Sequence, residues 1–154
     1  MQWEEYKSAF VADGYQRHIL VQGITLWHWQ RYYRFLRKTE ARLEFHLDGQ
    51  PIALPECLGL EMFSPDHTSV LCIGMAGIDF HCSLFGTDAL RIDFNPADID
   101  NPAKARLVFR IMTTLGRRLR KEVILYHEQG ETLFRYRWGE DGVRYLVKAD
   151  TLLG

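Results

Sequence analysis

Hydrophobic residues alternate one by one with charged or polar residues over residues 89–95. This period of two is typical of a β-strand with one buried face. The same alternation over residues 42–47, followed by Asp48 and Gly49, predicts a second strand that enters a tight hairpin. The clearest short-range patterns in the chain are therefore those of an antiparallel sheet.

Two longer segments instead repeat their hydrophobic residues at spacings of three and four, as amphipathic helices do. The first covers residues 25–40 and has Thr25 as its N-cap. The second covers residues 102–122, with Asn101 as N-cap and Pro102 as its first residue. Cations crowd the C-terminal end of the second helix, where they complement the helix dipole; they are Arg117, Arg118, Arg120 and Lys121.

Shorter hydrophobic segments predict the remaining strands. They lie at residues 6–23 (two strands around Asp13-Gly14), 58–64, 69–86 (divided by Gly74 and Gly77), 123–128, 132–138 and 143–149. The last three, separated by glycine-containing turns, predict an antiparallel meander. Because no polar linker, low-complexity run or internal repeat interrupts the chain, we expect a single α+β domain over residues 1–154. We expect a mostly antiparallel sheet with two main helices in a single layer on it.

Composition and charge narrow the class of protein. The 154 residues include 47% hydrophobic and 25% charged residues, which is ordinary for a folded globular chain. The net charge of -1 argues against a general nucleic-acid binder, because such proteins usually carry a large basic excess. A local basic patch remains compatible with this composition.

Cysteine usage and the first residues favour the cytoplasm. Cys57, Cys72 and Cys82 are odd in number and lack a CxxC spacing, so we expect reduced, mostly buried thiols. The first ten residues contain acidic side chains where a signal peptide has a positive region. No stretch approaches the roughly 18 apolar residues of a membrane span. We therefore expect a cytoplasmic protein without a membrane segment.

One strand segment, IDFHCS, raises the question of a metal or catalytic site. Alternation puts Asp79 and His81 on one face and Cys82 on the other, so His81 and Cys82 cannot bind one metal ion. Asp79 and His81, joined by Asp93 from the next strand, could hold a metal or ligand, or pair a base with its orienting acid. The same residues equally suit a strand face that meets water or a partner. Both interpretations stay open.

Common catalytic and nucleotide-binding motifs do not occur in the chain. The sequence has no GxSxG, GxGxxG, GxxxxGK[ST] or HExxH, and no cysteine has a neighbouring cation that would lower its pKa. We therefore predict no catalytic residue and no cofactor, and we favour a binding protein over an enzyme.

Two groups of residues have the composition of a contact surface. On the first helix, Trp27, Arg31 and Arg34 follow at spacings of four and three. Tryptophan and arginine are enriched at interface hot spots, although a cation–π pair between Arg31 and Trp27 would also suit a surface that contacts no partner. The second group is acidic and consists of Asp93, Asp98 and Asp100.

Three weaker alternatives remain beside a protein partner. The arginine-rich end of the second helix, with exposed aromatic residues, could bind RNA, although the net charge makes nucleic acid the lesser expectation. An exposed sheet edge or the Trp27 surface could form a two-fold homodimer. A small metal- or ligand-binding enzyme would use the face with Asp79, His81 and Asp93.

Several segments are also suggestive as a set: ADGYQRHILV, the helix with Trp29, FHLDG, LPE, IDFHCSLF, LRIDFNPADI and VILYHE. Together they resemble small bacterial proteins of the immunity-like kind, which are encoded beside secreted or contact-delivered toxins. The resemblance implies an α+β fold, a bacterial cytosolic setting and a toxin that is neutralised by occlusion. It implies no catalytic residues. The preferred hypothesis is therefore a non-catalytic protein-binding domain.

Overall fold

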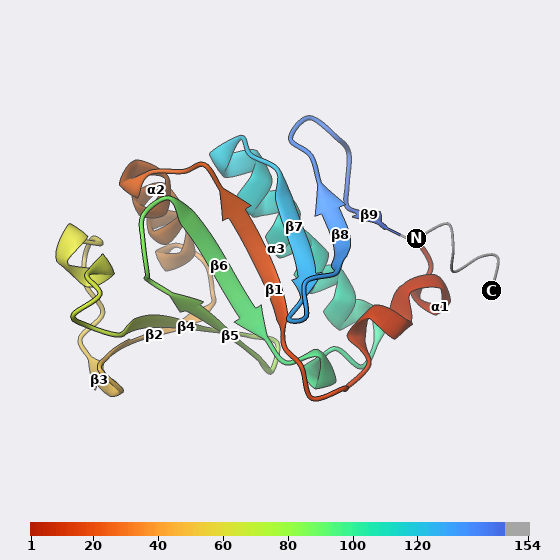
Figure 1. The fold of residues 1–154 in the computed structure, drawn as a ribbon, viewed down its shortest axis with the longest axis horizontal. Helices are drawn as coiled ribbons and strands as arrows, with labels where there is room; N and C mark the ends of the chain where they lie inside the picture. Colours follow the sequence, from red (N-terminus) through yellow and green to blue (C-terminus); the bar gives the residue numbers. More distant parts are fainter. Residues whose placement is uncertain (147–154) are drawn as a thin grey trace.

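A nine-stranded antiparallel sheet runs through the computed structural model, which describes residues 1–146 (Figure 1). Its strands are β1 (Arg17–Gln22), β2 (Arg42–Leu47), β3 (Gln50–Ile52), β4 (Ser69–Met75), β5 (Ile78–Ser83), β6 (Ala89–Phe94), β7 (Val123–His127), β8 (Thr132–Tyr136) and β9 (Arg144–Tyr145). They lie in the order β3-β2-β4-β5-β6-β1-β7-β8-β9. The first strand of the chain therefore lies inside the sheet, between β6 and β7.

Helices cover one face of this sheet. The α-helices of the described residues are α1 (Trp3–Tyr6), α2 (Leu26–Arg37) and α3 (Pro102–Leu119), and the 3₁₀ turns are η1 (Lys7–Phe10), η2 (Leu60–Phe63) and η3 (Pro96–Asp98). The two long helices, α2 and α3, pack against each other behind the sheet in Figure 1. The expected α+β fold, with a single layer of two main helices, is confirmed.

The core lies between the helices and the sheet. Cα partners on neighbouring strands point their side chains to the same face, and one such row crosses seven strands without a polar residue. Its members are Phe45, Leu71, Cys82, Ile92, Ile19, Leu125 and Phe134. Each is at most 3% exposed, and full burial of such a side chain contributes about 1.5–3 kcal/mol. The alternation seen in the sequence therefore identifies the helix-facing side of the sheet.

Both long helices begin where the sequence predicts. The Oδ1 atom of Asn101 accepts a hydrogen bond of 2.9 Å from the backbone N–H of Lys104, and Pro102 is the first residue of α3. Thr25 is the N-cap of α2, and its backbone N–H donates to Nδ1 of His28 at 3.0 Å. These bonds satisfy backbone groups that a helix end leaves without partners.

The hairpin expected at the N-terminus is wrong in its first half, because that segment forms α1 and η1. Tyr6 and Phe10 stand four residues apart and both pack on the ring of Phe134, at centroid distances of 5.8 and 5.6 Å. The buried side chain of Arg17 holds the end of the segment, since its Nε donates to the carbonyl of Ala9 at 2.7 Å. Long-range contacts therefore decide the conformation of this segment.

The strand expected at residues 58–64 is also wrong, because this segment contains the 3₁₀ turn η2. The side-chain amide of Gln30 on α2 bonds both backbone groups of Leu58, accepting from its N–H at 2.9 Å and donating to its carbonyl. Phe63 then packs edge-on against Trp29 at 5.0 Å. The backbone at Leu58 is thereby bonded to a helix and is not available to a neighbouring strand.

Two hairpin turns agree with the sequence pattern in more detail. Asp48 and Gly49, and likewise Ala76 and Gly77, have positive φ at two consecutive positions, as a tight two-residue hairpin requires. Gly77 therefore divides the long hydrophobic segment, as expected, whereas Gly74 stays inside β4.

Three other expectations concern thiols, the membrane and the chain's end. All three cysteines are unpaired, but Cys57 is exposed and Cys72 is half-buried, so the expectation of mostly buried thiols is wrong and holds for Cys82 alone. Within residues 1–146, no helix is long and apolar enough to cross a membrane. Of the strand expected at 143–149, β9 is present, and residues 147–149 lie outside the described residues. A single domain over residues 1–154 stays a prediction.

Candidate functional site

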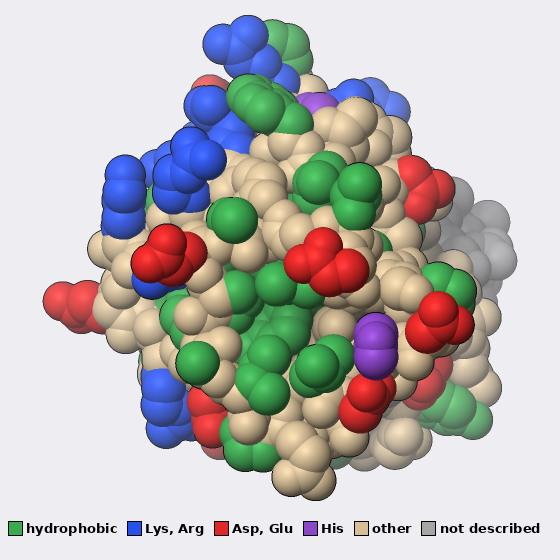
Figure 2. All heavy atoms as spheres, turned by 90° about the vertical axis from the view of Figure 1, so that its left-hand side faces the viewer, with side chains coloured by type: hydrophobic (Ala, Val, Ile, Leu, Met, Phe, Trp, Pro, Cys, Tyr) green, Lys and Arg blue, Asp and Glu red, His purple; other side chains and the backbone are tan. Residues whose placement is uncertain are grey.

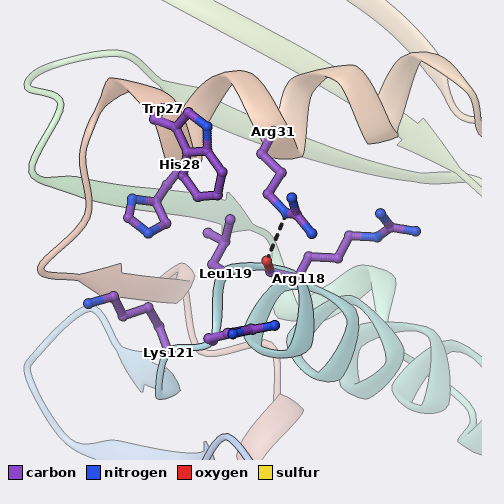
Figure 3. Close-up of a pocket in the computed structure, with 7 residues that line it drawn as sticks. Trp27, His28, Arg31, Arg118, Leu119 and Lys121 are labelled. Atoms are coloured by element: carbon purple, nitrogen blue, oxygen red, sulfur yellow. Dashed lines mark hydrogen bonds between the residues drawn. The ribbon is translucent and has the colours of Figure 1, made fainter.

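A cleft lies where the N-terminal end of α2 meets the C-terminal end of α3 (Figure 3). Its volume is about 520 Å³, within the range of roughly 300–1,000 Å³ that is usual for ligand pockets. It is lined by Trp27, His28, Arg31, Arg118, Leu119, Arg120 and Lys121. We call this the α2/α3 cleft.

Trp27 forms the exposed wall of the α2/α3 cleft. Its side chain is 62% exposed, and the ring of His28 stands edge-on to it at 5.1 Å. In Figure 3, Trp27 and His28 project from α2 toward Leu119 and Lys121 at the end of α3. The cleft thus combines an aromatic wall with a cationic one.

The arginines of the cleft lie against aromatic rings. The guanidinium carbon of Arg118 is 3.7 Å from the ring centre of Phe35, and that of Arg120 is 5.8 Å from the ring centre of Trp138. The guanidinium carbon of Arg31 is 5.4 Å from the ring centre of Trp27, and the Nε of Arg31 donates to the carbonyl of Arg118 at 3.1 Å. Stacking uses the flat face of a guanidinium and leaves N–H groups at its edge for other acceptors.

The α2/α3 cleft is strongly cationic. Among residues 1–146, no carboxylate lies within 4.0 Å of its four cations, which are Arg31, Arg118, Arg120 and Lys121. The pKa of His28 is lowered by burial and then by the charges of Lys121 and Arg31, which favours its neutral form at pH 7. Because its Nδ1 accepts from the Thr25 N–H, its proton is on Nε2, which is therefore a donor.

Positive charge extends beyond the cleft along α2. Arg34 and Arg37 on this helix and Lys38 at its C-cap are all exposed. Figure 2 shows Lys and Arg side chains gathered at its upper left, while the Asp and Glu side chains are more scattered. A protein of net charge -1 therefore presents one face with a local excess of cations.

The residues predicted to contact a partner fall on separate surfaces. Trp27 and Arg31 line the α2/α3 cleft, and Arg34 is exposed on α2 outside the lining. Asp98 and Asp100 precede α3, whose 18 residues span about 27 Å between them and the cleft. A partner that contacts both groups would have to extend along the whole length of α3.

The face of the sheet opposite the helices carries polar side chains in register across six strands. We call them the polar row; they are Glu44, Cys72, His81, Asp93, His18 and Tyr126. The row brings His81 beside Asp93, as the ligand-binding alternative expects. Asp79 lies two residues from His81 and is exposed, with its Oδ1 3.6 Å from the guanidinium of Arg42.

The carboxylate of Asp93 is already bonded within the polar row. Its Oδ1 is 2.6 Å from Nδ1 of His18 and 2.9 Å from Nε of Arg91. Asp93 and His18 are only 8% and 6% exposed, which leaves little of either for a partner to contact. Within residues 1–146, no group of three or more His, Cys, Asp or Glu side chains is placed to hold a metal ion.

Within the polar row, the candidate nucleophile is the thiol of Cys72, because its Sγ is 3.6 Å from Nδ1 of His81. Burial raises the pKa of the Cys72 thiol, and the charges of Glu44 and Asp79 raise it further. A protonated thiol is a weak nucleophile. The geometry of the row therefore supports a structural role better than a catalytic one.

Sequence reasoning identified part of the cleft and missed part of the polar row. The spacing of Trp27 and Arg31 identified one wall, and Arg120 and Lys121 were identified only as helix-end cations. His18 was missed, although its position on the outward face of β1 was readable from alternation. What the sequence did not show is that β1 lies beside β6, which brings His18 to Asp93.

Comparison of the chain with protein-family models, curated proteins and solved structures finds no match.

Proposed function

We propose that this chain is a non-catalytic, cytoplasmic protein-binding domain and that the α2/α3 cleft is its contact surface. The observation that carries the proposal is the exposure of Trp27, at 62%, beside Arg31 on the wall of a cleft. Tryptophan and arginine are the side chains that most often dominate binding energy when a partner covers them.

The electrostatics of the cleft favours an acidic partner. Four cations line a space of about 520 Å³, and no described carboxylate lies within 4.0 Å of them. Like charges held this close repel one another, and an acidic surface placed over them relieves that repulsion. Complementary charge also speeds association and discriminates against basic proteins.

In its specific form, the proposal is that the partner is a bacterial toxin, which the chain neutralises by occluding its working surface. The resemblance of segments such as LRIDFNPADI to immunity-like proteins supports this form. An acidic toxin surface would meet the α2/α3 cleft. A basic toxin would instead meet the surface near Asp98 and Asp100, at the other end of α3.

The test is direct binding to the purified product of the neighbouring gene, with the variant Trp27→Ala. Truncation of a hot-spot residue costs about 2 kcal/mol or more, so we expect affinity to fall by roughly 30-fold or more. Leu60→Ala is the matched control, because Leu60 is 65% exposed but lies on η2. It should bind as the unchanged protein does.

Three outcomes contradict the proposal. The first is the absence of a stoichiometric complex, and the second is a Trp27→Ala variant that binds with full affinity. A dimer of the purified chain that Trp27→Ala dissociates would show that a second copy occupies the cleft, which also overturns the proposal.

A further inference from the structure

We propose that the α2/α3 cleft binds a phosphate group carried by a phosphorylated side chain of the partner protein. This inference deepens the proposed function and rests on it for the kind of partner. The phosphate site itself is argued from charge, from the orientation of the arginines and from the backbone at Arg120.

The amount of charge in the cleft suits a phosphate better than a single carboxylate. Four cations line the cleft and no described carboxylate lies within 4.0 Å of them. A carboxylate would supply one negative charge, whereas a phosphorylated side chain carries about −1.5 to −2 at pH 7 and has three acceptor oxygens. The dianion neutralises more of the positive charge with one group.

The orientation of the arginines suits an oxyanion. Arg31 and Arg120 each lie against an aromatic ring, at 5.4 and 5.8 Å, and stacking leaves N–H groups at the guanidinium edge for hydrogen bonds. In Arg31 these are the Nη groups, because its Nε donates to the carbonyl of Arg118. A guanidinium edge matches two oxygens of a phosphate at once. His28, on α2 like Arg31, adds an Nε2–H donor, and Arg120 follows α3, so the cleft offers donors from both helices.

The backbone at Arg120 is a separate observation. Arg120 follows α3 with φ +55° and ψ +47°, the left-handed conformation that helices normally give to glycine. Its side chain lines the cleft and lies over Trp138. Backbone strain of this kind occurs at functional positions, where the side chain is needed more than an unstrained backbone. We assign Arg120 as a phosphate-binding residue on this ground.

An RNA is the competing source of phosphate, and the charges favour a phosphoprotein over it. A single-stranded RNA needs a basic groove that follows several nucleotides, and proteins that bind it usually carry a basic excess. Here the net charge is -1, and although Arg34 and Arg37 extend the positive charge along α2, the cations that line a concave site gather around one cleft. One phosphate group fits that distribution.

The experiment is an NMR titration of the full chain at constant ionic strength, first with inorganic phosphate and then with O-phosphoserine. The readout is the indole N–H signals of Trp27 and Trp138, assigned among the four tryptophans with Trp→Phe variants. We expect saturable shifts of both signals. Arg120→Gly should weaken phosphate binding about tenfold or more, as expected for loss of a charge-assisted hydrogen bond.

Arg120→Gly also separates binding from folding, because glycine relieves the left-handed backbone and should leave stability equal or higher. Arg110→Gln is the matched control, since Arg110 is an exposed cation on α3 outside the cleft lining. Absence of a saturable shift, or equal weakening in the Arg120→Gly and Arg110→Gln variants, would overturn the inference. Much tighter binding of a short oligouridine than of O-phosphoserine, with a steep salt dependence, would replace it with nucleic-acid binding.

The two proposals fail in different ways. If the neighbouring gene product binds in a Trp27-dependent manner but phosphate does not bind, the phosphate site is refuted and the contact surface stands. If phosphate binds at the cleft but no protein partner does, the phosphate site stands and the proposed function is refuted.

Discussion

Replacing Gly116 by alanine tests how closely α3 packs on the sheet. Gly116 lies close to the C-terminal end of α3, and that end lines the α2/α3 cleft. A Cβ atom at this position would lie 2.4 Å from Cδ1 of Tyr136 and 3.1 Å from the carbonyl oxygen of Lys121. Carbon atoms in contact are about 3.5–4.0 Å apart, so the neighbours would have to move by roughly 1 Å. Tyr136 is only 1% exposed, and the other contact is backbone, so neither has free space to move into.

Two opposing effects set the size of the change. Alanine is a better helix former than glycine by about 1 kcal/mol. Over-packing of a core costs about 1–3 kcal/mol and sometimes more. Because the missing space is about 1 Å against a buried ring and the backbone, over-packing outweighs propensity here. Over-packing near the upper end of its range, about 2–3 kcal/mol, less about 1 kcal/mol of helix propensity, leaves an expected net loss of about 1–2 kcal/mol of unfolding free energy. This corresponds to a fall in Tm of roughly 2–8 °C for a chain of this size.

The assay is thermal and urea unfolding followed by circular dichroism. Gly142→Ala is the control, because a Cβ there would meet nothing within 4 Å. In a Tyr136→Leu background, Gly116→Ala should cost less, since the clashing ring is gone. An unchanged Tm for Gly116→Ala, or the same loss in both backgrounds, would refute the packing argument.

Two further predictions concern charged side chains. Hydrogen bonds from Arg17 and His127 hold the pKa of Asp13 well below its usual range. The stability that Asp13 contributes is therefore present above its unfolded pKa of about 3.9 and is lost as the pH falls below that value. Asp13→Asn should therefore lower the urea midpoint at pH 7 and lower it less at pH 3, and an equal difference at both pH values would contradict this linkage. Asp93→Asn removes the charged partner of buried His18 and should cost about 1–3 kcal/mol in urea unfolding, while phosphate binding at the α2/α3 cleft stays unchanged. An Asp93→Asn variant that folds stably but loses the protein partner would show that the polar row is the functional surface.

The sequence predicted those parts of the fold that depend on local patterns. Strict alternation over residues 89–95 identifies β6, and Asn101 with Pro102 identifies the start of α3. The prediction for the N-terminal segment was wrong because Tyr6 and Phe10 are hydrophobic at positions that fit either a strand or a helical turn. What decides between them is the ring of Phe134, more than 120 residues away, which no local pattern reports.

The candidate site also has one part that follows from local sequence spacing and another part that depends on the tertiary fold. Trp27 and Arg31 are four residues apart on one helix, so their proximity follows from helical spacing alone. The contact between Arg31 and the carbonyl of Arg118 joins residues separated by 87 positions and depends on where the strands lie. The His18–Asp93 pair of the polar row, separated by 75 positions, depends on the same strand order.

The position of β1 explains why the cleft exists. β1 leads into α2 through Gly23, and α3 leads into β7 through Lys121 and Glu122. Because β1 and β7 are antiparallel neighbours, with Leu20 opposite Ile124, the end of β1 lies beside the start of β7. The start of α2 and the end of α3 must therefore meet at the same end of these two interior strands, and a Cβ on Gly23 would lie 3.9 Å from Nζ of Lys121. The pairing of these two strands places the aromatic wall on α2 opposite the cations of α3, so the cleft follows from the topology and its charge from the side chains at those two helix ends.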